Sequence, residues 1–273
     1  MHHGVWRKSA IGSHEVRGRT LGIVGYGNIG AQVSVLAEAL GLSVMYYDVA
    51  DKLPMGNAHR CDSLEELLQS VDVVTVHVDG RADNTLLFGE QEFSMMRPRS
   101  LFLNLSRGHV VDVAALADNL RTGHLAGAAV DVYPSEPRSG DEPFVSELQS
   151  LDNVILTPHV GGSTQEAQID IGRYVAGKLI DYSERASTSM SVNLPDITTG
   201  ATPGARIGHL HLNMPGIMAD LNRLVADHGG NVTYQALATR GELGYTVLDI
   251  DETDRELLVD VTRLEGTIRA RVL

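Results

Sequence analysis

A glycine-rich hexapeptide between an apolar run and a helix-like run is the feature that most limits how this chain can fold. Gly25-Tyr26-Gly27-Asn28-Ile29-Gly30 follows the apolar run 20–24 and precedes an alanine-rich segment, 29–40. Glycines at such a junction let backbone amides and a helix N-terminus approach a pyrophosphate without a Cβ in the way. The hexapeptide therefore predicts a dinucleotide-binding strand–loop–helix unit rather than a structural glycine turn.

Asp48 supports this interpretation by its position. It closes the next apolar run, 43–47, at the spacing where a carboxylate can accept a hydrogen bond from a ribose hydroxyl. No arginine directly follows Asp48 to receive a 2′-phosphate, and this pattern favours NAD over NADP. We therefore expect NAD as the cofactor.

The bulk composition excludes several classes of protein. The 273 residues are 43% apolar and 21% charged, as in an ordinary globular protein, and are enough for two domains. The net charge of −13 argues against nucleic acid or an anionic membrane as a partner. Cys61 is the single cysteine, no apolar run approaches membrane-spanning length, and the first residues do not form a signal peptide. We expect a cytoplasmic protein, and no metal site is predicted.

Short apolar runs alternate with helix-like segments through the first part of the chain. The expected helices after the hexapeptide are 64–70, 89–96 and 112–122, with Ser63 and Asp112 as N-caps. This alternation predicts an α/β fold with a doubly wound, parallel, six-stranded Rossmann sheet covered on both faces. The six expected strands are 20–24, 43–47, 73–77, 100–104, 125–130 and 153–157.

The pattern changes after the sixth run. Residues 163–184 show the spacing of an amphipathic helix, and 185–205 are rich in Ser, Thr and Gly, as in a linker. Residues 206–273 read as β-α-β-β-α-β, the order of a small ferredoxin-like α+β domain. We therefore expect a cofactor domain over 1–184, a linker over 185–205 and a separate domain over 206–273.

Three residues that could carry chemistry follow the last three expected strands of the sheet. They are Arg107, Glu136 and His159, a guanidinium, a carboxylate and an imidazole. Ligands of open α/β sheets bind at the carboxyl ends of the strands, so the three side chains are expected at the edge where a nicotinamide would lie. Each also has a simpler explanation when taken alone. Arg107 could be a surface arginine, Glu136 an acidic residue of a turn, and His159 a histidine bonded to the backbone.

Four stretches, GYGNIG, LNLSRGHVVD, AAVDVYPSEP and LTPHVGGSTQEAQ, resemble those of the D-isomer-specific 2-hydroxyacid dehydrogenases. The last domain resembles an ACT domain, an amino-acid-sensing module. This combination is similar to the bacterial family members that oxidise 3-phospho-D-glycerate to 3-phosphohydroxypyruvate in the first step of L-serine biosynthesis. The resemblance extends over nearly the whole chain.

The family resemblance implies roles for named residues. Arg107 would hold the substrate carboxylate, His159 would take the hydroxyl proton, and Glu136 would orient the imidazole. The expected cofactor contacts include the three glycines of the hexapeptide and residues after four of the strands. They are Gly25, Gly27, Asn28, Ile29, Gly30, Asp48, Leu105, Ser106, Arg107, Asp131, His159, Val160, Gly161 and Gly162.

The ACT resemblance implies an effector site for L-serine. In the family, His211 and Asn213 of one subunit and Asn231 of its partner would hold the amino acid between paired domains. We therefore expect a homo-oligomer, paired through the ACT and cofactor domains, with serine feedback inhibition. The bland alternative is a turn followed by a helix cap at Asn213-Met214-Pro215-Gly216.

The chain also departs from the family pattern. Family members begin with a substrate-binding domain, whereas this chain starts just ahead of the first cofactor strand. The sequence therefore leaves two other hypotheses open: a truncated product that binds NAD and serine without turnover, and another D-2-hydroxyacid dehydrogenase. Asp79-Gly80 replaces a usual proline, and Pro203-Gly204 replaces the paired glycines of a hinge.

Overall fold

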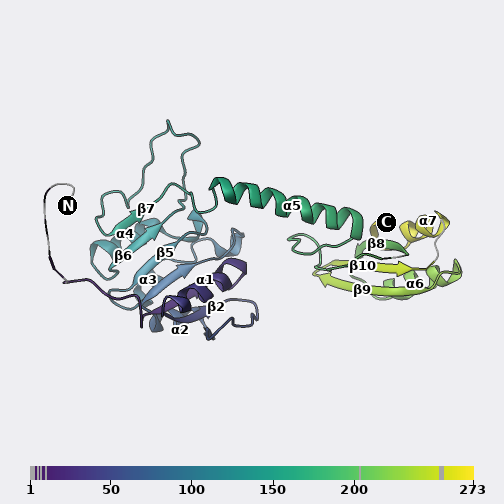
Figure 1. Ribbon diagram of the computed structural model, residues 1–273, viewed down its shortest axis with the longest axis horizontal. Helices are drawn as coiled ribbons and strands as arrows, with labels where there is room; N and C mark the ends of the chain where they lie inside the picture. Colours follow the sequence, from purple (N-terminus) through teal and green to yellow (C-terminus); the bar gives the residue numbers. More distant parts are fainter. Residues whose placement is uncertain (1–3, 5, 7, 10, 203, 252–254) are drawn as a thin grey trace. The chain divides into compact units, whose positions relative to one another are not determined.

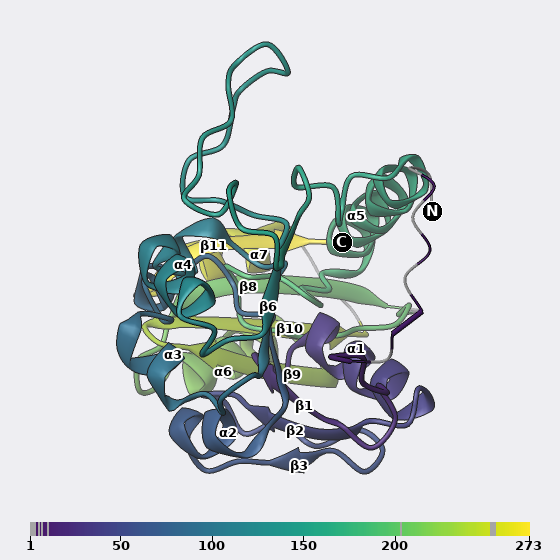
Figure 2. The ribbon, with the colours of Figure 1, turned by 90° about the vertical axis from the view of Figure 1, so that its left-hand side faces the viewer.

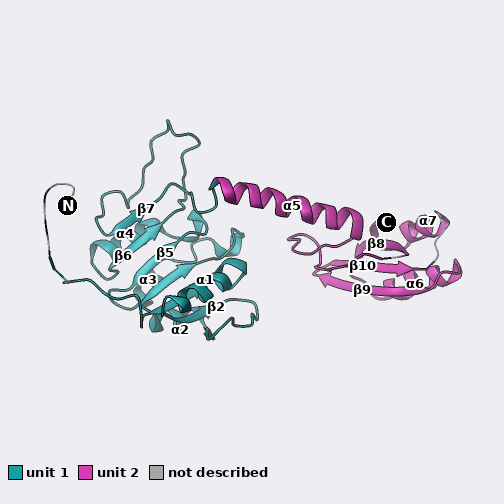
Figure 3. Cartoon of the chain, in the orientation of Figure 1, with its two compact units in different colours: residues 1–164 teal, residues 165–273 magenta. Residues whose placement is uncertain are grey.

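The computed structural model describes residues 4, 6, 8–9, 11–202, 204–251 and 255–273. Contacts divide the chain into two compact units, Met1–Thr164 (unit 1) and Gln165–Leu273 (unit 2), shown in teal and magenta in Figure 3. Each unit is described by itself. Among the described residues, no helix has the length and apolar character needed to cross a bilayer.

Unit 1 is built on a parallel sheet in the order β3-β2-β1-β4-β5-β6-β7 (Figure 1). Its strands are β1 (Thr20–Val24), β2 (Ser43–Tyr47), β3 (His59–Arg60), β4 (Val73–Val76), β5 (Leu101–Asn104), β6 (Gly127–Val130) and β7 (Val154–Leu156). All six expected strands are present, but the expected count of six is wrong. The seventh strand, β3, has two polar residues and pairs only with Met45 and Tyr46 of β2.

The helices of unit 1 form two layers around this sheet. They are α1 (Asn28–Ala39), α2 (Leu64–Ser70), α3 (Glu90–Met95) and α4 (Val113–Arg121), with the 3-10 turns η1 (Ala82–Asn84) and η2 (Gly108–Val110). One buried cluster joins α1 to β1 and β2, and a larger one joins α2, α3 and α4 to the strands. Both expected N-caps are present, because Ser63 accepts from Glu66 N and Asp112 accepts from Ala114 N and Ala115 N.

The connections that follow the carboxyl ends of β4, β5 and β6 are longer than the one that follows β1. In particular, the segment between β6 and β7 extends away from the sheet as a loop (Figure 2). This segment and its neighbours carry the candidate catalytic residues, so the fold places them where parallel strands end.

Unit 2 contains a long helix and a four-stranded antiparallel sheet in the order β11-β8-β10-β9. Its elements are α5 (Gln165–Arg185), β8 (Ala205–Leu212), α6 (Ile217–Asp227), β9 (Val232–Arg240), β10 (Leu243–Ile250), α7 (Arg255–Arg263) and β11 (Thr267–Val272). The β-α-β-β-α-β order is the expected one. Gly216 is the N-cap of α6, and Pro215 lies in the turn before it.

The segment between α5 and β8 is packed, although its composition is typical of a linker. Ala186, Thr188 and Ile197 are buried, and Thr188 N donates to Ile197 O at 2.9 Å. Ala186 and Ile197 join Tyr245 and Val247 of β10 in one apolar cluster. These contacts hold the segment against the second sheet.

Arg206 attaches the end of α5 to this sheet. Its guanidinium forms a two-pronged pair with Asp249 at 2.6 and 2.7 Å and donates to Arg185 O and Gly200 O. Both charged side chains are buried, so removing one partner would cost about 3–5 kcal/mol. The helix 163–184 was expected with the cofactor domain, whereas contacts group α5 with the second sheet.

Candidate active site

The glycine-rich loop has the backbone geometry of a pyrophosphate-binding turn. Gly25 has φ +92°, and a Cβ there would lie 2.8 Å from His77 O. At Gly30 a Cβ would lie 2.2 Å from Gly25 O, so only glycine lets α1 approach β1 this closely. By contrast, a Cβ on Gly27 would meet no atom within 4 Å, which leaves the loop open toward a ligand.

The backbone N–H groups at the start of α1 are not capped by a side chain. Its N-cap, Gly27, has no side-chain cap, and the first turn holds no acidic residue. Asn28 and Ile29 are exposed there, with Ile29 at 63%. A helix N-terminus of this kind favours an anion through its N–H groups and dipole.

Asp48 lies beside the same loop. Its carboxylate accepts from Tyr26 N at 2.7 Å and from Ala50 N at 2.8 Å, and its side chain is partly exposed. Each carboxylate oxygen keeps a lone pair for a further donor such as a ribose hydroxyl. Loop, helix and carboxylate thus fit the pyrophosphate and adenosine ribose of NAD, which when bound supplies a nicotinamide that accepts or returns hydride.

Arg107 lies on a short loop that a buried asparagine shapes. Asn104 Oδ1 accepts from Ser106 N and Oγ, and Asn104 Nδ2 donates to Arg107 O at 3.1 Å. The Arg107 guanidinium donates to Ser106 O at 2.7 Å, and its side chain passes close to Gly80. Leu105, between them, is 49% exposed. The loop is ordered by its own polar groups, and the guanidinium, which has five N–H donors, uses one of them on Ser106 O.

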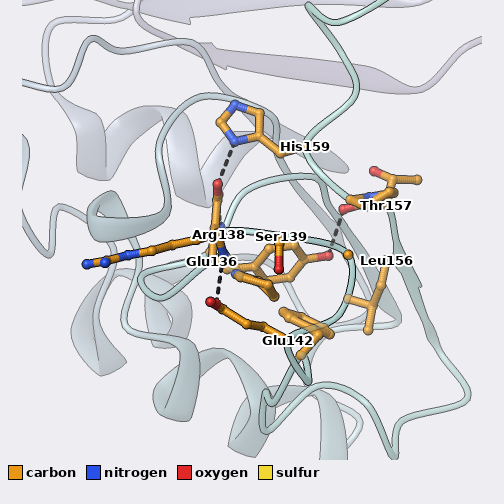
Figure 4. Close-up of a pocket in the computed structure, with 12 residues that line it drawn as sticks. Glu136, Arg138, Ser139, Glu142, Leu156, Thr157 and His159 are labelled. Atoms are coloured by element: carbon orange, nitrogen blue, oxygen red, sulfur yellow. Dashed lines mark hydrogen bonds and ion pairs between the residues drawn. The ribbon is translucent and has the colours of Figure 1, made fainter.

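His159 and Glu136 form a hydrogen-bonded pair (Figure 4). His159 Nδ1 lies 2.8 Å from Glu136 Oε2, and Glu136 Oε1 accepts from Tyr133 N at 3.0 Å. Burial alone would raise the pKa of Glu136, but the hydrogen bonds from His159 and Tyr133 outweigh it and lower the pKa. An ionised carboxylate only accepts, so the proton shared between them is on Nδ1.

Asp131 anchors the loop that carries His159. Its carboxylate accepts from Thr157 Oγ1 at 2.6 Å and from Val160 N and Gly161 N at 3.0 Å each. Burial would raise the pKa of Asp131, but these bonds and the nearby His159 lower it. His159 itself has φ +53°, a left-handed conformation that costs about 1–3 kcal/mol in a residue other than glycine. The bonds to Asp131 hold that conformation in place.

A cavity of about 560 Å³ adjoins the pair on the side of the β6–β7 loop. Phe144, Leu156 and Pro158 contribute apolar surface to its lining, and Arg138 and Glu142 contribute charge. Figure 4 shows Glu136 and His159 at this cavity, joined by their hydrogen bond. The imidazole is therefore about half exposed, with 47% of its side chain accessible.

The three residues proposed for an effector do not form one site within the chain. Asn213 N donates to Glu242 O before β10, whereas Asn231 N donates to Asp251 Oδ1 after its end. The eight residues of β10 therefore separate them by roughly 25 Å. His211 is buried, and its ring nitrogens lie 2.8 Å from Leu212 O and 3.0 Å from Thr246 Oγ1.

The structure brings most of the expected site residues of unit 1 to one edge of the sheet, and it adds one that the sequence analysis missed. Tyr133 contacts both Glu136 and the strand before His159. It belongs to the motif AAVDVYPSEP, but nothing in a single sequence distinguishes an aromatic residue that packs from one that positions its neighbours. No group of three or more His, Cys, Asp or Glu side chains within the described ranges could hold a metal ion.

Comparisons with known proteins agree with this geometry. Residues 1–161 match the model of the D-isomer specific 2-hydroxyacid dehydrogenase NAD binding domain, and residues 207–269 match an AHAS small subunit-like ACT domain. D-3-phosphoglycerate dehydrogenase of Escherichia coli K12 is 48% identical over 275 residues, covering 100% of this chain and 67% of the relative. The Dictyostelium discoideum enzyme of the same name is 45% identical with the same coverage. A D-lactate dehydrogenase from Sporolactobacillus superposes with a TM-score of 0.60 at 29% identity, covering 73% of this chain and 61% of that one.

Proposed function

This chain belongs to the D-isomer specific 2-hydroxyacid dehydrogenases, and on that premise we propose that it oxidises 3-phospho-D-glycerate to 3-phosphohydroxypyruvate with NAD. The observation that supports this most is the His159–Glu136 pair at 2.8 Å, at the edge of the sheet that also holds the glycine-rich loop. Relatives named for phosphoglycerate, 48% and 45% identical, favour that substrate over other 2-hydroxy acids.

The proposed reaction assigns one task to each residue. Arg107 binds the substrate carboxylate, because a planar guanidinium recognises it through two parallel hydrogen bonds. His159 Nε2 accepts the proton of the C2 hydroxyl as hydride leaves C2, and returns it in the reverse direction. Glu136 holds the imidazole by Nδ1 and stabilises the imidazolium that forms, since its lowered pKa keeps it ionised.

We further propose that L-serine inhibits the enzyme through the ACT domain. Because Asn213 and Asn231 lie at opposite ends of β10, a site that uses both takes one from each of two copies. Both ring nitrogens of His211 already have partners within the domain. Its proposed role is therefore to support the turn that presents Asn213. A homo-oligomer paired through the ACT and cofactor domains, in the cytoplasm, completes the proposal.

Steady-state turnover distinguishes the alternatives. The chain is assayed for NADH formation with 3-phosphoglycerate and with D-lactate and D-2-hydroxyisocaproate, and NAD binding is measured by calorimetry. Preferential turnover of 3-phosphoglycerate supports the proposal. Preference for another acid indicates a different D-2-hydroxyacid dehydrogenase. NAD binding without turnover of any substrate supports the binding-only alternative and contradicts an active enzyme.

A further inference from the structure

Tyr133 contacts all three segments that carry the proposed catalytic residues. Its backbone N–H donates to Glu136 Oε1 at 3.0 Å, on the oxygen that His159 does not use. Its phenol OH donates to Thr157 O, also at 3.0 Å, two residues before His159. One residue is thus bonded both to the carboxylate and to the strand end that supplies the imidazole.

The third contact is made by the Tyr133 backbone. A Cβ on Gly108 would lie 2.0 Å from Tyr133 C and 2.1 Å from Tyr133 O, far inside van der Waals contact. The absence of a side chain at Gly108 therefore lets the Arg107 loop lie directly against Tyr133. The position of Arg107 relative to Glu136 depends on this close approach.

The phenol is built into the protein as a fixed donor. Tyr133 is 8% exposed, and its ring meets Phe144 edge-on with centroids 4.5 Å apart. Its OH is also 3.0 Å from Val130 O, so one proton is shared by the carbonyls at the ends of β6 and β7. Burial raises the pKa of Tyr133, and the Asp131 and Glu136 carboxylates raise it further against the effect of the Thr157 bond. The phenol accordingly stays protonated and able to donate.

We propose that Tyr133 is a positioning residue that sets the relative placement of Arg107, Glu136 and His159. It touches none of the reacting atoms and acts through its neighbours. The inference rests on the proposed function, since it deepens the account of the same site. Its specific content is that the phenol OH, and not only the ring, holds the Thr157–His159 segment at the distance where Nδ1 meets Glu136.

The substitution Tyr133→Phe isolates this bond. It keeps the ring against Phe144 and the N–H that Glu136 accepts, and removes only the OH. We expect kcat to fall about 10- to 100-fold, because displacing a reacting group by about 1 Å has effects of that size, while the Kd for NAD stays unchanged. In nitrogen-15 spectra of histidine-labelled protein, the His159 signals should change from a single Nδ1–H tautomer to a mixture. His159→Gln identifies those signals.

A matched control separates positioning from stability. Tyr46→Phe removes another buried phenol OH, which donates to Lys52 O at 2.7 Å next to the opposite edge of the sheet. It should lower the melting temperature about as much as Tyr133→Phe, but leave kcat and the His159 signals unaltered. Equal losses of kcat in both variants would assign Tyr133 a stability role only and overturn the proposal.

The spectroscopic readout also keeps this inference separate from the proposed reaction. If the parent chain shows no turnover of any 2-hydroxy acid, the proposed function fails, yet the tautomer of His159 can still be compared between parent and Tyr133→Phe. Unchanged His159 signals in that variant would overturn the positioning role whatever the activity. A shift to mixed tautomers would support it.

Discussion

The two units place His159 and His211, the two histidines proposed to act, in opposite environments. In unit 1, His159 is about half exposed, has a left-handed backbone and has its Nδ1 bonded to an ionised carboxylate. In unit 2, His211 is buried, and both its ring nitrogens have partners within the domain. The first arrangement leaves a nitrogen for chemistry, whereas the second uses the ring to support structure.

The difference follows from topology. Parallel strands deliver their carboxyl ends to one edge, so Arg107, Glu136 and His159 converge although they are distant in sequence. In the second sheet β8 and β9 both run antiparallel to β10 and therefore parallel to each other, so Asn213, after β8, and Asn231, before β9, lie at opposite ends of the sheet on one copy. The three residues of unit 1 can therefore meet within one chain, whereas a site that used both Asn213 and Asn231 would need two copies.

The most direct way to break this comparison is to remove the imidazole of unit 1. His159→Gln deletes the proposed base, and kcat should fall about 10²–10⁴-fold with the Kd for NAD unchanged. His124→Gln is the matched control, because its ring is bonded to Phe93 O, away from the strand ends. Steady-state kinetics and calorimetry measure both variants. Equal kcat values for His159→Gln and parent would remove His159 from the mechanism.

The next largest effect is expected where the loops of unit 1 touch. In Gly108→Ala the new methyl group would force the Arg107 loop away from Tyr133, which lowers kcat/KM about 10²-fold and stability by about 1–3 kcal/mol. Gly140→Ala, where a Cβ meets no atom within 4 Å, should change neither quantity. Kinetics and thermal unfolding test the pair, and identical behaviour of the two variants would contradict the close approach.

The two-copy character of the effector site can be tested by complementation. At 100 times its Kd, serine should stabilise the parent by about 2.7 kcal/mol, seen as a raised melting temperature. Asn213→Ala and Asn231→Ala should each abolish that shift. A refolded mixture of the two variants should recover part of it, because a hybrid pair contains one intact site. Absence of a shift in the parent would end the serine proposal, and no recovery in the mixture would contradict the shared site.

The last prediction compares how the stability of the two units depends on pH. Burial, with a smaller contribution from His211, lowers the pKa of His209 to about 4, whereas an unfolded histidine has a pKa near 6.5. Between these values the unfolded state binds more protons, so stability of unit 2 should fall as pH drops from about 6.5 to 4.

Unit 1 should respond at lower pH. The lowered pKa values of Asp131 and Glu136 give stability that is present above their unfolded values near 4 and is lost as pH falls through the folded ones. Calorimetry between pH 7 and 4 should show the transition of unit 2 moving first. His209→Asn should flatten that dependence, and parallel shifts of both transitions would contradict the assignment.

The sequence was most informative where burial constrained it. The six predicted strands are confirmed because each stands out as a short apolar run, even β7, which has no buried residue, whereas β3, His59–Arg60, has no apolar signal. Glu136 and His159, which were expected at the same edge of the sheet, form a hydrogen bond, while their catalytic roles stay a prediction. Tyr133 escaped prediction because its function depends on which carbonyl its OH reaches, and no residue pattern encodes that distance.

Composition misled where small polar residues pack. Residues 185–205 contain the serines, threonines and glycines of a flexible connection, yet the buried Thr188 Oγ1 donates to Pro195 O and accepts from Ile197 N. Short hydroxyl side chains can satisfy backbone groups inside a fold as readily as they interact with water. A composition cannot show which of the two occurs.

This packed segment changes where the protein can be cut and recombined. The bond of the Arg206 guanidinium to Arg185 O, the cation–π contact of Arg271 on Tyr182 and the bond of Tyr245 OH to Ala186 O fasten the end of α5 to the second sheet. In a chimaera joined at residues 185–205, the groups of α5 that Arg206, Arg271 and Tyr245 contact would come from another protein and would not be matched to this sheet. Exchange of sensory modules between such dehydrogenases should therefore carry α5 along, with the junction at Thr164 and Gln165.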